Sequence, residues 1–134
     1  MGTSSAQIDE TVAVVAEPAV NTEPELASSE DDWLCAWCLE AVAKNQHRFS
    51  YEGRDEFVFT NPEGIVFEII TFSRAGGCVQ KGLTTLANTW FPGYAWSYAL
   101  CAGCGQHLGW FYAGKDQFLG LIKDRLVRRL CLRN

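Results

Sequence analysis

The chain has 134 residues, with 16 acidic and 11 basic side chains, a net charge of -5 and a hydrophobic content of 48%. This length suits one domain, and the apolar content excludes a wholly disordered chain. The mildly acidic average also argues against a dedicated nucleic-acid-binding protein.

Residues 1–32 differ in composition from the rest of the chain. They hold eight of the acids and no Lys, Arg or aromatic residue, so residues 33–134 carry a net +3 and all 17 aromatic residues. Because such a segment cannot bury enough apolar surface to offset the entropy of ordering, we predict a disordered acidic tail over 1–32, with an acidic interaction arm as the alternative. We see no secretory signal and no apolar run of membrane-spanning length, and we expect a cytoplasmic protein with reduced thiols.

From residue 33 onward the pattern predicts a mainly β fold. Residues 57–60 and 65–72 are rich in β-branched and aromatic side chains, and the turn sequence Asn61-Pro62-Glu63-Gly64 separates them, which predicts a β-hairpin. A helix is predicted only for residues 124–132, as a short amphipathic element. Further strands are predicted over 78–81, 97–100, 108–112 and 117–122.

Two Cys-x-x-Cys motifs, Cys35 to Cys38 and Cys101 to Cys104, are the strongest local signals. Each motif places two sulfurs on one side of a tight loop, and two motifs together complete a tetrahedron around Zn²⁺. Four thiolates leave no open coordination position, so we predict one structural zinc ion that clamps two distant parts of the domain. A redox-active pair is the alternative, although no βαβ pattern surrounds either motif.

Three other residues are candidates for this chemistry. His107, three residues after Cys104, could replace a cysteine as a metal ligand, but packing or a hydrogen bond is the favoured role. Cys78 and Cys131 lie outside the pairs, and we interpret them as structural or incidental thiols.

Residues 90–112 hold eight of the 17 aromatic residues. A β core of large side chains would explain them, but cores use Trp sparingly because the indole N–H needs a partner. Three tryptophans, with Pro92-Gly93 between two of them, favour a shaped pocket, and both interpretations stay open. Because residues 69–115 contain no Asp or Glu, a neutral ligand is favoured over a cation, unless folding brings Glu63 or Glu68 close.

The order of these motifs resembles a known family. Residues 33–126 are similar to the thalidomide-binding domain of cereblon, the CULT domain, and most of all to its short single-domain bacterial members. On this resemblance the domain spans 33–126, and residues 127–134 form a short basic extension. The shared motifs are Cys35-x-x-Cys38, Asn61-Pro62-x-Gly64, Trp90-Phe91-x-Gly93-Tyr94-x-Trp96, Cys101-x-x-Cys104 with His107-x-Gly109-Trp110, and Gly120-Leu121.

The resemblance implies a β-tent, in which two antiparallel sheets meet at a steep angle and one structural zinc on the four cysteines pins them together. It also implies a cage that holds a five- or six-membered cyclic imide, such as the glutarimide ring of thalidomide. In the family, two backbone segments hydrogen-bond the ring and an asparagine side chain approaches the part of the ligand outside the cage. The matching residues are Trp90, Trp96 and Trp110 for the walls, Tyr112 for the base, Asn88 and Trp90 for the backbone contacts, and Asn61 for the asparagine.

We therefore expect a binding module and not an enzyme. Its candidate ligands are glutarimides, uracil-type rings and protein chains that end in a cyclic imide. The alternative is a β-tent thiol enzyme of the methionine sulfoxide reductase type B kind, for which Cys78 or Cys131 would be the nucleophile.

Two residues depart from the family pattern, and one larger region is missing. Asn88 stands where animal cereblon has His, and Tyr98 is bulkier than the aliphatic residue usual near the cage. The Lon-like region and the adaptor-binding helices of cereblon are absent from this sequence, so we expect no ubiquitin-ligase adaptor among its partners. We expect no membrane partner either, and we consider nucleic acid at the basic C-terminal residues only as an alternative.

Overall fold

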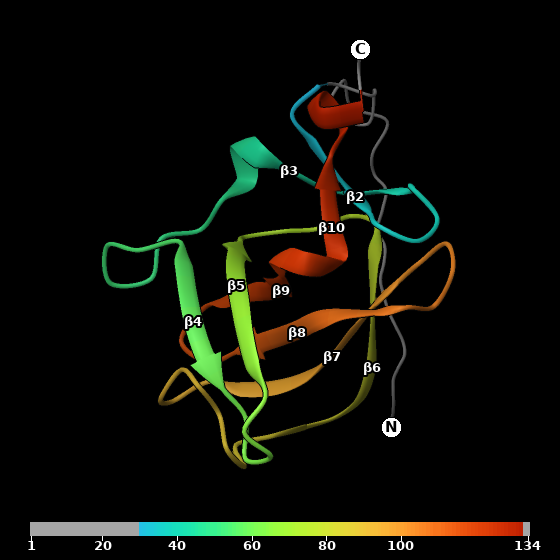
Figure 1. The fold of residues 1–134 in the computed structure, drawn as a ribbon. Coiled ribbons are helices and arrows are strands. Elements are labelled where there is room, and N and C mark those ends of the chain that lie inside the picture. The colour runs from blue at the N-terminus through green and yellow to red at the C-terminus, as the bar shows by residue number, and fades with distance from the viewer. Residues whose placement is uncertain (1–29, 133–134) are drawn as a thin grey trace, which may run out of the picture.

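The computed structural model describes residues 30–132, so only the last three residues of the predicted tail fall within it. In this part of the chain all strand pairings are antiparallel and form two sheets, with the orders β10-β2-β3 and β4-β5-β9-β8-β7-β6 (Figure 1). The predicted mainly β fold with two antiparallel sheets is confirmed. The strands are β2 (Asp32–Cys35), β3 (Ala41–Lys44), β4 (Glu56–Thr60), β5 (Val66–Phe72), β6 (Cys78–Thr85), β7 (Ala95–Cys101), β8 (His107–Ala113), β9 (Gln117–Ile122) and β10 (Leu126–Arg128).

The predicted hairpin is present as β4 and β5. Phe59 pairs with Phe67, and the turn between the strands is closed by the side chain of Asn61. Its Oδ1 accepts the backbone N–H groups of Glu63 at 3.0 Å and Ile65 at 2.9 Å. This asparagine-closed turn fixes the register of the hairpin and the position of its tip.

The C-terminal helix predicted over residues 124–132 is wrong. The segment instead forms the 3₁₀ turn η3 (Lys123–Arg125), strand β10, and a second 3₁₀ turn, η4 (Arg129–Leu132). Leu126 and Val127 pair with Cys35 and Leu34 of β2, so tertiary pairing decides the local structure. No helix in residues 30–132 is long and apolar enough to cross a membrane.

The strands also extend past both predicted domain limits, 33 and 126. Asp32, expected in the acidic tail, is the first residue of β2 and is only 1% exposed. Its carboxylate pairs with Lys44 at 2.9 Å and with Arg129 at 3.3 Å. Two cations from distant parts of the chain therefore compensate a buried charge that composition alone assigned to the tail.

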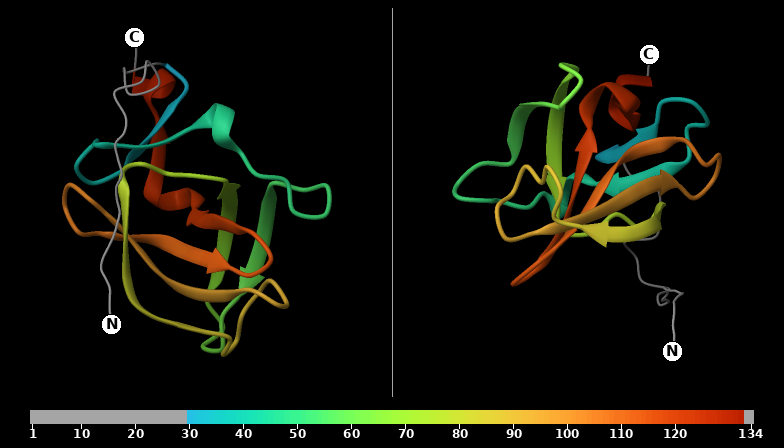
Figure 2. Two further views of the ribbon diagram at one scale, coloured as in Figure 1. Left: turned by 180° about the vertical axis from the view of Figure 1, so that it is seen from behind. Right: turned by 90° about the horizontal axis from the view of Figure 1, so that it is seen from below.

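The six-stranded sheet separates two cores. Along β5, Ile70 and Phe72 face one core and Ile69 faces the other; along β9, Leu121 and Ile122 are divided in the same way. This alternation follows the two-residue period of a strand. The first core lies between the two sheets, and β2, β3 and β10 lie together at one end of the molecule (Figures 1 and 2). The second core is mostly aromatic, and the pocket described below belongs to it.

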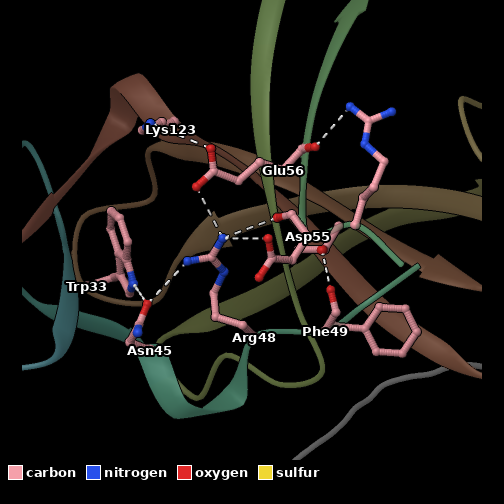
Figure 3. Close-up of polar contacts among 9 residues, drawn as sticks. Trp33, Asn45, Arg48, Phe49, Asp55, Glu56 and Lys123 are labelled. Carbon is pink, nitrogen blue, oxygen red and sulfur yellow. Dashed lines mark hydrogen bonds and ion pairs between the residues drawn. The ribbon is translucent and has the colours of Figure 1, made fainter. Parts of the chain in front are cut away.

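The 3₁₀ turn η2 (Asn45–His47) and the residue after it tie the small sheet to β4 (Figure 3). Asn45 Oδ1 accepts the indole N–H of Trp33 at 3.0 Å and a guanidinium N–H of Arg48 at 3.2 Å. Arg48 also pairs with Asp55 at 3.2 Å and Glu56 at 3.3 Å. The indole N–H of Trp33 therefore has a hydrogen-bond partner inside the core.

Candidate ligand pocket and metal centre

The four cysteines of the two Cys-x-x-Cys motifs meet in space. Their sulfurs all lie within 4.8 Å of one another, with Cys35 to Cys104 at 3.7 Å and Cys38 to Cys101 at 3.6 Å. Four thiolates about 2.3 Å from a tetrahedral ion lie about 3.8 Å apart, so the cluster has the dimensions of such a site. The arrangement can hold a metal ion and leaves no ligand position open.

The two cysteine loops share one backbone pattern. Cys35 and Cys101 each accept, through the carbonyl oxygen, the N–H of the residue four positions later, in both cases at 2.8 Å. Those later residues are Leu39 and Gly105, and both have positive φ angles, 64° and 80°. The two loops thus turn in the same way, and Gly105 adopts its positive φ angle without a steric cost.

The metal site joins the two sheets. Cys35 ends β2 of the small sheet, and Cys101 ends β7 of the large sheet. Both of these cysteines are buried, while Cys38 and Cys104 are exposed. An ion bound here would therefore clamp segments that are far apart in sequence, as predicted.

A cavity of about 340 Å³ lies on the aromatic side of the large sheet. All six predicted ligand-binding residues line it: Asn61, Asn88, Trp90, Trp96, Trp110 and Tyr112. Five residues that we had not assigned to a binding role line it too: Pro62, Glu63, Phe67, Tyr98 and His107. The His107-x-Gly109-Trp110 motif was the signal that could have pointed to His107.

Strand pairing explains why four of these side chains share one face. Trp96 lies opposite Tyr112, and Tyr98 lies opposite Trp110, on the neighbouring strands β7 and β8. Because side chains two residues apart point to the same side of a strand, the two cross-strand pairs form one continuous aromatic surface. The N-terminal end of this surface continues into His107.

The aromatic rings meet edge to face, as the walls of a cage do. Trp90 and Trp110 have an interplanar angle of 81° with ring centroids 5.1 Å apart, and the pair Trp96 and Tyr98 has 77° and 5.3 Å. Phe59 stacks on Trp90 at 4.9 Å and supports that wall. The pocket interpretation of the aromatic segment is therefore favoured over a simple core.

The loop between β6 and β7 is held in place by hydrogen bonds. Trp96 donates its indole N–H to the carbonyl of Ala87 at 2.7 Å, and the hydroxyl of Thr89 donates to the carbonyl of Tyr94 at 2.7 Å. Asn88 adopts a left-handed conformation with φ 57°. In residues 30–132, the backbone N–H and C=O groups of Asn88 and Trp90 have no hydrogen-bond partner. Two N–H donors and two C=O acceptors of residues that line the cavity are therefore free.

His107 is hydrogen-bonded on both ring nitrogens. Nε2 lies 2.9 Å from the carbonyl oxygen of Gly109, and Nδ1 lies 3.3 Å from Nη1 of Arg125. Because a carbonyl oxygen can only accept, Nε2 carries the proton and Nδ1 accepts from the guanidinium. Burial, and then the positive charge of Arg125, hold the pKa of His107 below its ordinary value. His107 is therefore a neutral wall residue, consistent with the predicted packing and hydrogen-bonding role.

Gly120 leaves the space that Tyr112 occupies at the base of the cavity. A Cβ atom at position 120 would lie 2.9 Å from Cγ2 of Ile69 and 3.2 Å from Cε2 of Tyr112. Both distances are shorter than ordinary carbon contacts. This close packing explains a glycine in the middle of a strand.

The remaining cysteines lie away from the aromatic pocket. Cys78 of β6 lies opposite Cys101 of β7 in the strand register, and burial raises the pKa of the Cys78 thiol. Cys131 is exposed in η4. Among the described residues, no cysteine lines the aromatic cavity.

A second hollow, of about 380 Å³, lies beside β3 and is a less suitable ligand site. Charged side chains of both signs line it, among them Glu40 and Arg74. His47 is the only ring in its wall, so it offers no enclosed aromatic surface of the kind that small-molecule sites prefer.

The fold and the site together describe a cluster of four cysteines that could hold a metal ion and a separate aromatic pocket, which fits a ligand-binding module. No family model matches the chain. It is similar to cereblon of Gallus gallus, with 36% identity over 78 residues, 54% of this chain and 18% of that protein. It is similar to cereblon of Xenopus tropicalis, with 37% identity over 78 residues, which are 54% of this chain and 17% of that protein. The similarity to cereblon of Drosophila melanogaster is 31% identity over 99 residues, which are 69% of this chain and 17% of that protein.

These matches support a cereblon-type domain in this chain. They span less than one fifth of the length of the curated relatives. The closer resemblance to short bacterial members stays a prediction.

Proposed function

We propose that this domain binds small cyclic imides in the cage of Trp90, Trp96 and Trp110, without catalysing a reaction. The candidate ligands are glutarimides such as the ring of thalidomide, uracil-type rings, and protein chains that end in a cyclic imide. The cysteine cluster holds one structural zinc ion in this proposal, since thiolate ligands in a tetrahedral arrangement suit zinc.

The observation that carries the proposal is the pairing of an aromatic cage with free backbone groups. The rings of Trp90 and Trp110 stand edge to face beside the cavity, next to the unpartnered backbone of Asn88 and Trp90. A cyclic imide is flat and neutral, and one edge carries an acceptor, a donor and an acceptor in a row. Backbone N–H and C=O groups can read that edge while the indoles cover the ring faces.

Size and selectivity point the same way. The cavity of about 340 Å³ lies at the lower end of the range for small-molecule sites, so it suits one compact ring. A ligand that lacks the imide N–H or one carbonyl would leave a polar group unpaired, at a cost of about 1–3 kcal/mol. The site should therefore discriminate an imide from a lactam of the same size.

The similarity to cereblon supports binding of this kind but not the rest of that protein's biology. The match covers a small part of cereblon, so we restrict the proposal to ligand binding and include no ubiquitin-ligase adaptor. The reductase alternative requires a thiol in the pocket, and the described residues place none there. We therefore expect no thiol-dependent turnover of methionine sulfoxide.

The decisive test is a titration followed by tryptophan fluorescence and by calorimetry. Glutarimide and uracil are added to the wild-type protein, and N-methylglutarimide serves as the ligand control because it lacks the N–H donor. Trp96→Ala removes one wall of the cage, while Trp37→Ala is the matched protein control because Trp37 is exposed at the metal loop and does not line the cavity.

We expect glutarimide to quench the fluorescence of the wild type and of Trp37→Ala, but not of Trp96→Ala. N-methylglutarimide should bind at least about fivefold more weakly, as the loss of one buried hydrogen bond predicts. Absence of binding by both unmethylated rings at millimolar concentration, or equal binding of the methylated ring, would contradict the proposal.

A further inference from the structure

We propose that Glu63 makes this pocket prefer cyclic imides that carry a positively charged substituent, such as a protonated amine, on the part of the molecule outside the cage. This inference rests on the proposed function and refines its ligand class. Sequence reasoning favoured a neutral ligand because the aromatic segment itself contains no acid. The structure changes that picture by bringing an acid from another hairpin to the cavity.

Glu63 reaches the cavity because the β4–β5 turn packs beside the tryptophan loop. The cavity that Glu63 lines is also lined by its turn neighbours Asn61 and Pro62 and by the cage residue Trp90. Asn61 also orients the carboxylate, since its Nδ2 donates to Glu63 Oε1 at 3.2 Å while its Oδ1 accepts the Glu63 backbone N–H at 3.0 Å. The carboxylate is thus positioned at the mouth and is not a random surface charge.

The charge of Glu63 has no counterpart in the pocket wall. Of the residues that line the cavity, it is the only Asp, Glu, Lys or Arg. Arg125, which does not line the cavity, binds His107, a residue of the wall, through its guanidinium. Within residues 30–132, no salt bridge involves Glu63. The wall therefore carries one net negative charge when His107 is neutral.

A cation at the mouth gains from two sources. The faces of the indoles carry partial negative charge, and a cation within about 6 Å of a ring centroid is attracted to them. The Glu63 carboxylate adds a direct electrostatic attraction. Because Glu63 is exposed, this attraction is screened by water and salt, and exposed ion pairs of this kind correspond to an affinity gain of about two- to fivefold.

The experiment compares three ligands by calorimetry. The first is unsubstituted glutarimide, the second a 3-substituted glutarimide whose short chain ends in a primary ammonium, and the third the same compound with that amine acetylated. Each is measured with the wild type, with Glu63→Gln, and with Glu68→Gln at about 10 mM and about 500 mM salt. Glu68→Gln is the matched control because Glu68 lies on the same hairpin, is exposed and does not line the cavity.

We expect the wild type and Glu68→Gln to bind the ammonium compound about two- to fivefold more tightly than its acetylated partner at low salt. The preference should shrink at high salt and disappear in Glu63→Gln, so that this variant binds the ammonium compound and its acetylated partner with equal affinity. Equal affinities of the two substituted ligands in the wild type, or a preference that survives in Glu63→Gln, would overturn the inference and leave the proposed function intact. If unsubstituted glutarimide itself does not bind, the proposed function fails.

Discussion

The guanidinium of Arg125 donates a hydrogen bond of 2.8 Å to the backbone carbonyl of His107. The backbone carbonyl of Arg125 in turn accepts the N–H of Ala36, a residue of the first cysteine motif, at 3.0 Å. His107 in turn lies edge to face with Trp110 at 5.1 Å and with Tyr98 at 5.3 Å. Arg125 is therefore a direct physical connection between the metal loop and the wall of the aromatic pocket.

Replacement of Arg125 should disturb both ends of this connection. We expect Arg125→Met, which keeps the aliphatic length and removes the donors, to destabilise the domain by about 1–3 kcal/mol, because the His107 carbonyl loses a charged partner. Glutarimide affinity should fall as well, since the orientation of His107 is no longer fixed. Denaturant unfolding and calorimetry measure the two effects. Lys115→Met, at an exposed site, is the control, and unchanged affinity in Arg125→Met would refute the connection.

The lowered pKa of His107 should make the free energy of unfolding depend on pH. Burial and the charge of Arg125 lower its pKa in the folded state, so the unfolded chain binds a proton more readily. The contribution of neutral His107 is fully present above the unfolded pKa of about 6.5 and is lost as the pH falls toward the folded value. One proton changes the free energy of unfolding by at most about 1.4 kcal/mol per pH unit.

Urea unfolding at several pH values between about 7.5 and about 5 checks this effect. The wild type should lose stability as the pH falls through this window, and His107→Gln should show a flatter profile. If the two proteins have parallel profiles, the pH dependence comes from other groups.

Removal of the metal should unfold the small sheet or the whole domain. Zinc binding to structural sites contributes about 10–16 kcal/mol in peptides at pH 7, which matches or exceeds the total stability of a typical domain. We expect one zinc per chain by native mass spectrometry, and loss of the near-ultraviolet circular dichroism after chelation. Cys104→Ser should lose the metal, whereas Cys131→Ser, at an exposed thiol outside the cluster, should keep it. Metal-free protein with unaltered unfolding would show that the site is not structural.

A methyl group at position 120 should damage the base of the pocket. In Gly120→Ala the added Cβ collides with Ile69 and Tyr112, and overpacking of this kind costs about 1–3 kcal/mol. The displaced Tyr112 ring would enter the cavity and weaken glutarimide binding. Gly76→Ala is the control, because nothing lies within 4 Å of a Cβ at that position. Crystal structures of both variants would show whether Tyr112 moves, and an unmoved ring with unchanged affinity would contradict the prediction.

The sequence allowed most strands and the cysteine cluster to be predicted, because their signals are local. The turn at Asn61 follows from four consecutive residues, and each Cys-x-x-Cys motif describes its own loop. The position of Asp32 could not be predicted, since its partners Lys44 and Arg129 lie elsewhere in the sequence. Strand β10 was missed for the same reason, because three residues form a strand only beside β2.

The pocket was predictable as a set of residues but not as a charge distribution. The family motifs indicated the three tryptophans, and the pairing of Trp96 with Tyr112 follows from antiparallel neighbours. Glu63 is 27 positions from Trp90 in the sequence, and only the packing of the hairpin turn against the tryptophan loop brings both to one cavity. The wall contributed by His107 depends likewise on the contact with Arg125.

The pairing of β2 with β10 also has a consequence for biosynthesis. On the ribosome β2 emerges early, while the strand that completes its sheet emerges after almost all of the described domain has been made. Cys35 and Cys38 wait for Cys101 and Cys104 to complete the sulfur cluster, and β2 waits longer still, until Arg128 has left the exit tunnel and can pair with Trp33, although domains usually fold as units during synthesis. A fusion or truncation made at Leu126 would cut through this last strand, so expression designs should keep residues through Leu132.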